Sequence, residues 1–113
     1  MNITFTSKKL EKLANNDKML LKEYGKIMAS KISLRLSQLK DADTLEDVRH
    51  LPGRFHELIE DRKGQWACDL VHPNRLIFEP HEKPIPTDAH GRYLWIEIKG
   101  VEILEITDYH KEK

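Results

Sequence analysis

Three consecutive side chains near the end of the chain can all carry protons: the carboxylate of Asp108, the phenol of Tyr109 and the imidazole of His110. They follow an apolar run, residues 101–106, that has the pattern of a partly buried strand. Titratable groups at the end of a chain form either a solvated tail or a site that the preceding strand holds in place. The rest of the sequence must decide between these two interpretations.

A further histidine, His56, could complete a site for acid–base chemistry. The reaction that suits such a set is cleavage of a phosphodiester through attack by the neighbouring 2′-hydroxyl group. This reaction needs a base for the hydroxyl proton, an acid for the leaving oxygen and cations for the charged phosphorane. His56, Asp108 and His110 are candidates for the acid and the base, in either order. Tyr109 could stack on a nucleobase or orient a proton.

The cations that this chemistry requires are present at Arg62, Lys63 and Arg75. Arginine suits phosphate because its guanidinium group donates two parallel hydrogen bonds. Each residue also has an ordinary structural interpretation. Arg62 and Lys63 could be surface charges in a turn, and Arg75 could pair with Asp69 or Glu57.

Composition limits the possible domain number, disulfides and metal sites. The 113 residues, 39% apolar and 34% charged, fit one soluble domain. The net charge is zero, although the first 40 residues hold nine Lys and Arg residues against three acidic ones. A single cysteine excludes an internal disulfide and fits a reducing cytoplasm. The histidines lack metal-ligand spacing, so we expect no metal and no cofactor.

Neither a membrane span nor a signal peptide is expected. No apolar run approaches the roughly 20 residues that a membrane helix needs. The first residues also lack the basic-then-apolar order of a secretory signal.

The elements that must position these residues begin with a strand and a helical hairpin, residues 1–40. Residues 3–5 alternate as a short strand does, and Ser7 can cap a first helix that runs to residue 14. Asp17 is a candidate cap for a longer second helix, in which apolar residues recur every three or four positions for about five turns. We expect this apolar stripe to pack in the core.

Residues 54–79 change to the pattern of a three-strand antiparallel meander, with strands at 55–59, 66–71 and 75–78. A proline-rich insertion, residues 80–100, follows and ends in an extra strand, Tyr93–Ile98. That strand is expected to form a hairpin with the last strand, which belongs to the segment 101–110. The predicted fold is therefore a single α+β domain, β-α-α followed by an antiparallel sheet, with the helical hairpin on one face.

Five segments resemble the HigB branch of the RelE/ParE superfamily of bacterial type II toxins, also called proteic killer proteins. They are Leu51–Leu58, Asp61–Trp66, Asn74–Phe78, Val101–Ile106 and Asp108–His110. The combination is fairly specific, although each motif alone would be weak. The resemblance covers the chain from about residue 45 onward, and residues 1–40 agree only in their pattern of two helices.

This resemblance implies a ribosome-dependent endoribonuclease that cuts messenger RNA in the decoding site of the small ribosomal subunit. The catalytic histidine of the family falls on His56. Its terminal acidic, tyrosine and histidine residues fall on Asp108, Tyr109 and His110, and its strand arginine falls on Arg75. The implied partner is a HigA-like helix-turn-helix antitoxin, through which the complex could bind operator DNA.

The chain departs from the family in three respects. It is neutral where the family is usually basic, it carries the insertion 80–100, and it continues past His110. The insertion could cover the cleft, contact an antitoxin or do neither. Two other functions stay open: a ParE-like toxin that inhibits a protein target such as DNA gyrase without catalysis, and an inactive toxin retained as a DNA-binding or complex-forming partner.

Overall fold

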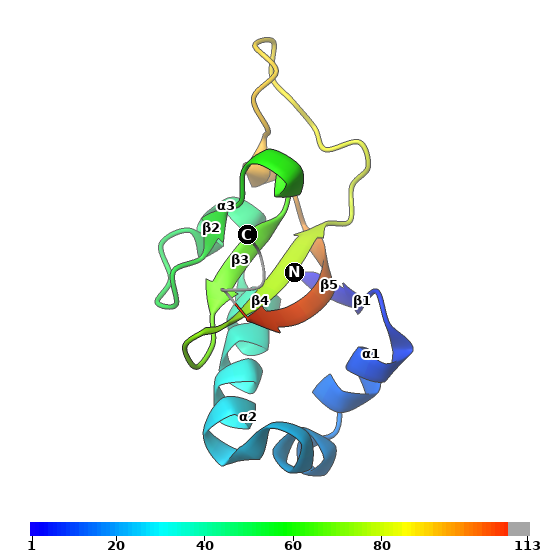
Figure 1. Ribbon diagram of the computed structural model, residues 1–113. Helices are drawn as coiled ribbons and strands as arrows, with labels where there is room; N and C mark the ends of the chain where they lie inside the picture. The colour runs from blue at the N-terminus through cyan, green and yellow to red at the C-terminus, as the bar shows by residue number, and fades with distance from the viewer. Residues whose placement is uncertain (109–113) are drawn as a thin grey trace.

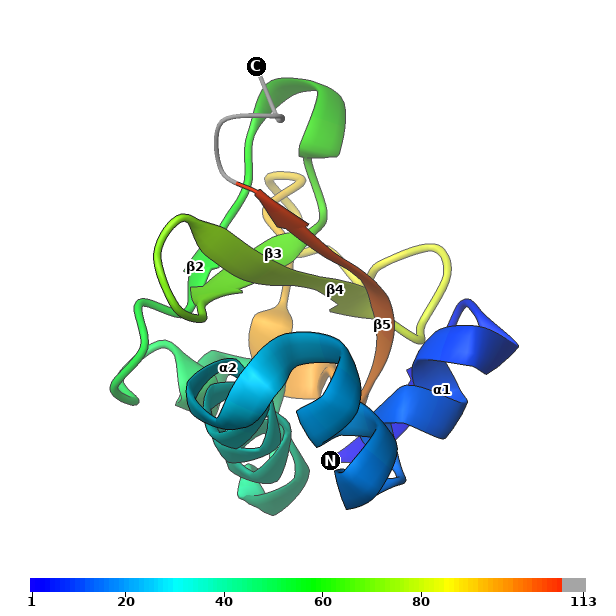
Figure 2. The same cartoon turned by 60° about the horizontal axis from the view of Figure 1, so that its bottom comes forward.

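The computed structural model describes residues 1–108, which form a five-stranded sheet with helices α1 and α2 on one of its sides (Figures 1 and 2). In chain order the elements are β1 (Asn2–Phe5), α1 (Lys8–Ala14), α2 (Asp17–Asp41), α3 (Leu45–Val48), β2 (His56–Glu57), η1 (Glu60–Arg62), β3 (Trp66–Asp69), β4 (Asn74–Pro80), η2 (Trp95–Glu97) and β5 (Gly100–Asp108). The predicted α+β class and the β-α-α start are confirmed.

The strand order is β1-β5-β4-β3-β2, so the last strand of the chain lies inside the sheet. Strands β2, β3 and β4 form the expected antiparallel meander, and β5 continues it antiparallel to β4. Strand β1 closes the other edge by pairing parallel to β5. Strand β4 therefore lies beside β5 from Val101 to Asp108.

Capping side chains define where the helices begin. Ser7 caps α1 by accepting a hydrogen bond from the amide of Leu10 at 3.0 Å, as expected. The cap of α2 is Asn16, one residue before the predicted Asp17. Gly25, with φ of 80°, interrupts α2 and kinks it, so the long apolar stripe spans two helical segments. No helix within residues 1–108 is long and apolar enough to cross a membrane.

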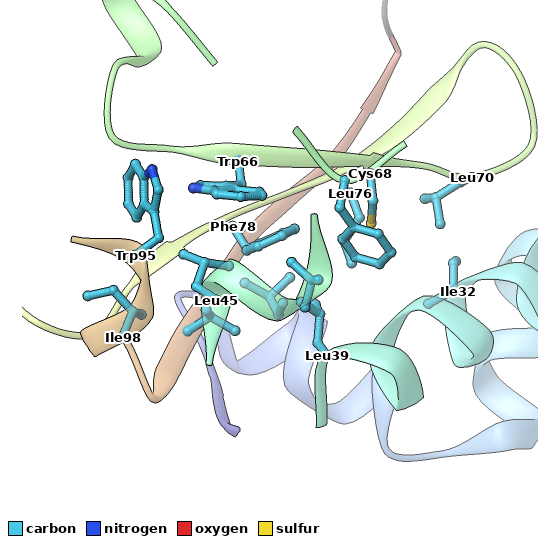
Figure 3. Close-up of a cluster of buried hydrophobic side chains, with 14 of the residues drawn as sticks. Ile32, Leu39, Leu45, Trp66, Cys68, Leu70, Leu76, Phe78, Trp95 and Ile98 are labelled. Atoms are coloured by element: carbon cyan, nitrogen blue, oxygen red, sulfur yellow. The ribbon is translucent and has the colours of Figure 1, made fainter. Parts of the chain in front are cut away.

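The core lies between the sheet and the helices (Figure 3). Trp66 and Phe78 are fully buried on neighbouring strands, and their rings stack 6.5 Å apart. Leu39 from α2 and Leu45 from α3 pack against them from the helical side. Burial of one large apolar side chain contributes about 1.5–3 kcal/mol, so this face of the sheet carries much of the stability.

The opposite face of the sheet carries the alternate residues of the same strands. Ala67 and Ile77 are also fully buried, yet they stand outside this core, because neighbouring residues on a strand point to opposite faces. The register places His56, Ala67, Ile77 and Glu105 in one row across the sheet. We call this side, away from the helices, the open face.

The expected extra strand Tyr93–Ile98 is wrong. Residues 95–97 form the 3-10 turn η2, and only an isolated bridge joins Thr87 to Tyr93. Both edges of β5 are already paired, with β1 and β4, so no edge is left for another strand. A 3-10 turn also places residues three apart on the same side, which buries Trp95 and Ile98 together.

A buried guanidinium group anchors the loop that leads to β2. Arg35 on α2 is 6% exposed, and its Nε donates to the carbonyl of Asp69 at 2.7 Å. Its Nη1 donates to the carbonyl of Pro52 at 3.1 Å. Gly53 packs directly against this group with φ of 115°, and its carbonyl accepts from the amide of Asp69 at 2.8 Å. Helix, loop and strand therefore meet at one side chain.

Replacing Gly53 by alanine is expected to lower the free energy of unfolding by about 3 kcal/mol, measured by urea denaturation. The new Cβ would lie 2.5 Å from Cζ of Arg35, so the guanidinium group would have to move. Gly91→Ala is the matched control, because Gly91 has φ of 79° with no atom within 4 Å of the new Cβ. Its expected loss is about 1 kcal/mol. Equal losses would mean that the contact with Arg35 adds nothing.

Cys68 provides a test of the core that depends on pH. Burial raises the pKa of its thiol, whereas in the unfolded chain the thiol ionises near its ordinary pKa of about 8.5. Ionisation then stabilises only the unfolded state. The wild type should lose about 2 kcal/mol relative to Cys68→Ser between about pH 7 and pH 10. Parallel pH profiles of the two proteins would contradict this assignment, and activity should survive the change.

Candidate active site

His56 and Arg75, two of the residues predicted to act together, are in contact on the open face. Nη1 of Arg75 lies 3.2 Å from Nε2 of His56. Nδ1 of His56 lies 2.6 Å from the carbonyl oxygen of Arg54. A guanidinium group can only donate and a carbonyl can only accept, so both contacts are hydrogen bonds together only if the ring carries a single proton, on Nδ1. Its Nε2 lone pair therefore points at Arg75.

The backbone before β2 gives His56 this orientation. Arg54 has φ of 50°, in the left-handed region, which turns its carbonyl back toward the imidazole two residues later. The preceding Gly53 is held against Arg35, as described above. The tautomer of His56 thus depends on a loop that α2 fixes from the other side of the sheet.

Arg75 is the second residue of β4 and is only 7% exposed. Its neighbours across the sheet are Asp69 on β3 and Thr107 on β5. A guanidinium group that the sheet surrounds in this way keeps a defined position, which suits recognition of a phosphate better than a mobile surface chain does. The two carboxylates considered as partners of Arg75 form ion pairs with other arginines: Asp69 with Arg54 and Glu57 with Arg49.

A pocket of about 280 Å³ lies beside Arg75. Its lining comes from the loop before β2, the end of β3, the β3–β4 turn and the start of β4: Arg54, Asp69, Leu70, His72, Pro73, Asn74 and Arg75. Arg54 is 66% exposed in its side chain and forms an ion pair with Asp69 at 3.1 Å. Two guanidinium groups thus border one small pocket, an arrangement suited to an anion.

Asp108 lies at the same end of the sheet, because the register pairs it with Asn74. Asn74 lines the pocket. Along β5, however, Thr107 is the residue in the row of Arg75, so strand alternation places Asp108 on the other face of the sheet from Arg75. Tyr109 and His110 lie outside the described residues, and their assignment to the site stays a prediction. Strand β5 does deliver its final residues to the end of the sheet where His56 and Arg75 meet.

Arg62 and Lys63 have different surroundings although they are consecutive. Arg62 is bound on the open face, where its guanidinium group donates to Glu105 at 2.9 Å and to Gln65 at 2.8 Å. Lys63 instead places its ammonium group 5.7 Å from the centre of the Tyr93 ring. The 3-10 turn η1 ends between the two residues and separates them. Of the two, only Arg62 shares a face with His56.

Sequence reasoning missed several residues of the pocket: Arg54, Asp69, His72 and Asn74. The signal for Asn74 was its position directly before Arg75, at the start of the resembling segment Asn74–Phe78. Arg54 and Asp69 have no such signal, because they meet only through the positive φ at Arg54 and the end of β3.

The arrangement provides the parts of a metal-independent phosphodiester cleavage. Nε2 of His56 can accept a proton once the guanidinium group of Arg75 donates to an incoming anion instead of to the ring. Arg75 and Arg54 can stabilise a phosphate that gains charge. Asp108 supplies a carboxylate at the same end of the sheet.

Solved structures with the same fold are bacterial toxins of low sequence identity. A YoeB/ParE toxin from Agrobacterium tumefaciens has a TM-score of 0.52 and 12% identity, covering 96% of this chain and 98% of that chain. A YoeB dimer from Staphylococcus aureus has a TM-score of 0.56 and 19% identity, covering 97% of each chain. No protein-family model and no curated protein sequence matches the chain. The likeness shows that the chain shares the fold of these two proteins.

The tautomer of His56 can be measured by nitrogen NMR of the imidazole ring. We expect Nδ1 to be protonated and Nε2 to be unprotonated at neutral pH, because of the contacts with Arg54 and Arg75. Arg75→Gln should retain the fold and the Nδ1 tautomer, because the carbonyl of Arg54 still accepts from Nδ1. A ring already protonated on Nε2 in the wild type would contradict the assigned geometry.

Proposed function

We propose that this protein is the toxin of a type II toxin–antitoxin system and that it cleaves messenger RNA on the ribosome. The contact between Arg75 and the neutral ring of His56, beside a pocket that a second arginine borders, is the observation that carries the proposal. A toxin that acted only by binding would not need a proton acceptor held in one tautomer. The toxin fold of the chain supports the same class of function.

In the proposed reaction, the scissile phosphate enters the pocket and takes the guanidinium group of Arg75 as its partner. Nε2 of His56 then accepts the proton of the 2′-hydroxyl group, whose oxygen bonds to phosphorus. Arg75 and Arg54 stabilise the phosphorane. The bond from phosphorus to the 5′-oxygen breaks, and an acid protonates that oxygen. The products are a 2′,3′-cyclic phosphate and a 5′-hydroxyl end.

Asp108 and His110 are the candidates for the acid, and Tyr109 is proposed to stack on a base or orient a proton. Arg62 is proposed to contact the RNA backbone after exchanging Glu105, an exposed ion-pair partner that contributes at most about 1 kcal/mol. This set of residues supports assignment to the HigB branch.

The partners that follow from this assignment are the small ribosomal subunit, the messenger RNA and a HigA-like helix-turn-helix antitoxin, in the cytoplasm. The antitoxin would carry the complex to operator DNA. Neutral net charge limits non-specific affinity for RNA, which depends on the number of phosphates that the protein neutralises. Positioning by the ribosome would compensate for this weak affinity.

A second candidate function is that of a ParE-like toxin that inhibits DNA gyrase without cleaving RNA. One structural neighbour is described as a YoeB/ParE toxin, which supports keeping a ParE-like function as the second candidate. The two functions differ in whether the residues around His56 are needed for toxicity.

Expression of the chain in bacteria should stop growth, and primer extension should reveal messenger cuts that appear only during translation. His56→Ala, Asp108→Ala and His110→Ala should each lower cleavage by about 10²- to 10⁴-fold, because each removes a group that transfers or orients a proton. The matched control is His50→Ala, since His50 is an exposed residue outside the pocket. Its toxicity should equal that of the wild type.

Growth arrest with intact messengers and blocked replication would instead favour inhibition of gyrase. Full toxicity of all three alanine variants, with folding confirmed by circular dichroism, would refute the site assignment.

A further inference from the structure

A second groove, of about 420 Å³, lies between the η1 turn and the insertion 80–100. Its lining residues are Glu57, Lys63, Gly91, Arg92, Tyr93 and Trp95. Figure 1 shows the two segments beside one another. A Cβ added at Gly64, next to Lys63, would lie 3.2 Å from Cδ1 of Ile85 and 3.8 Å from the hydroxyl of Tyr93. The groove therefore exists because the insertion folds back over η1.

The groove has a rigid aromatic wall. The ring of Tyr93 is half-buried and lies 4.9 Å from the buried ring of Trp95. Trp95 packs edge-on against Trp66 at 5.4 Å, which belongs to the core. Tyr93 thus packs on the buried ring of Trp95, which in turn packs on Trp66 in the core. A supported, partly exposed ring is the kind of surface on which an unpaired nucleobase stacks.

Lys63 gives the groove a positive charge that no carboxylate of residues 1–108 neutralises in an ion pair. Glu57 binds Arg49 at 2.8 Å, and Arg92 binds Asp88 at 2.9 Å. Within residues 1–108, no carboxylate forms an ion pair with Lys63, and the described partner of its ammonium group is the face of the Tyr93 ring. A cation–π contact at a partly exposed site is worth only about 0.5–1 kcal/mol, so the lysine can exchange it for an anion.

An RNA strand bound at the candidate active site could also reach this groove. His56 and Glu57 are consecutive in the edge strand β2, so their side chains lie on opposite faces of the sheet. Arg62 on the open face and Lys63 at the groove are likewise consecutive. A single-stranded polyanion that crosses this edge would contact both places.

We propose that this groove is a second nucleotide subsite, which binds an unpaired nucleotide of the RNA that flanks the cleaved phosphate. The inference rests on the proposed function. The base stacks on Tyr93, and Lys63 leaves the ring face to bind the adjoining phosphate through its flexible stem. Arg92 lies at the entrance, where its side chain is 75% exposed. The insertion would then extend the RNA surface rather than close it.

The test is binding of a fluorescent, eight-nucleotide single-stranded RNA whose 2′-oxygens are methylated, so that cleavage cannot interfere. Fluorescence anisotropy gives the Kd of the wild type and of each variant. Tyr93→Leu should weaken binding by about 5- to 100-fold, whereas Tyr93→Phe, which keeps the ring, should bind within about twofold of the wild type. Loss of binding in both variants, or in neither, would overturn the proposal.

Lys63→Ala should weaken binding and reduce the slope of log Kd against log salt by about 0.7, the value for one phosphate contact with a single strand. Lys99→Ala is the matched control, an exposed lysine at the end of the insertion, and should leave the slope unchanged. The proposal would also be overturned if the wild type bound no RNA. It would be overturned as well if a poly-glutamate peptide displaced the labelled RNA as well as unlabelled RNA of equal charge does.

This subsite and the proposed cleavage can fail separately. If messengers are cut in cells but Tyr93→Leu binds RNA as the wild type does, the subsite is wrong and the cleavage stands. If binding depends on Tyr93 and Lys63 but no messenger is cut, the subsite stands as an RNA-binding site and the proposed catalysis is wrong.

Discussion

The burial of one guanidinium group is the constraint on which the site depends. Arg35 reaches from the helical layer through the core to backbone carbonyls at the end of β3 and in the loop before β2. A buried cation is tolerated only where hydrogen bonds satisfy it, so the loop can take few other positions. That loop contributes both Arg54 and the carbonyl that fixes the His56 tautomer. The chemistry of the open face is thus set from the opposite face.

One face of the sheet packs in the core, and the other carries the residues of the candidate site. Trp66 and Phe78 face the helices and bury apolar surface, while the adjacent residues Ala67 and Ile77 point to the open face. The strands that carry His56 and Glu105 also carry core residues, so packing of the core holds the backbone of this row in place. Groups that must keep defined distances are best placed on such elements.

The parts of the fold that depend on local patterns could be predicted from the sequence. The capped first helix and the meander follow from residues close in the chain, and the meander alone brings His56 toward Arg75. Segment 93–98 could not be predicted, because its state depends on whether β5 has a free edge. The different environments of Arg62 and Lys63 also required the structure, since one 3-10 turn separates them.

The edge of the sheet at β2 is only two residues long. Long, flat edges invite other chains to add a strand, and short ones discourage it. A partner that recognised this edge through its own backbone would gain few hydrogen bonds there. Selectivity on this side of the molecule must therefore reside in side chains, so it can change by substitution in η1 or the insertion without disturbing the sheet.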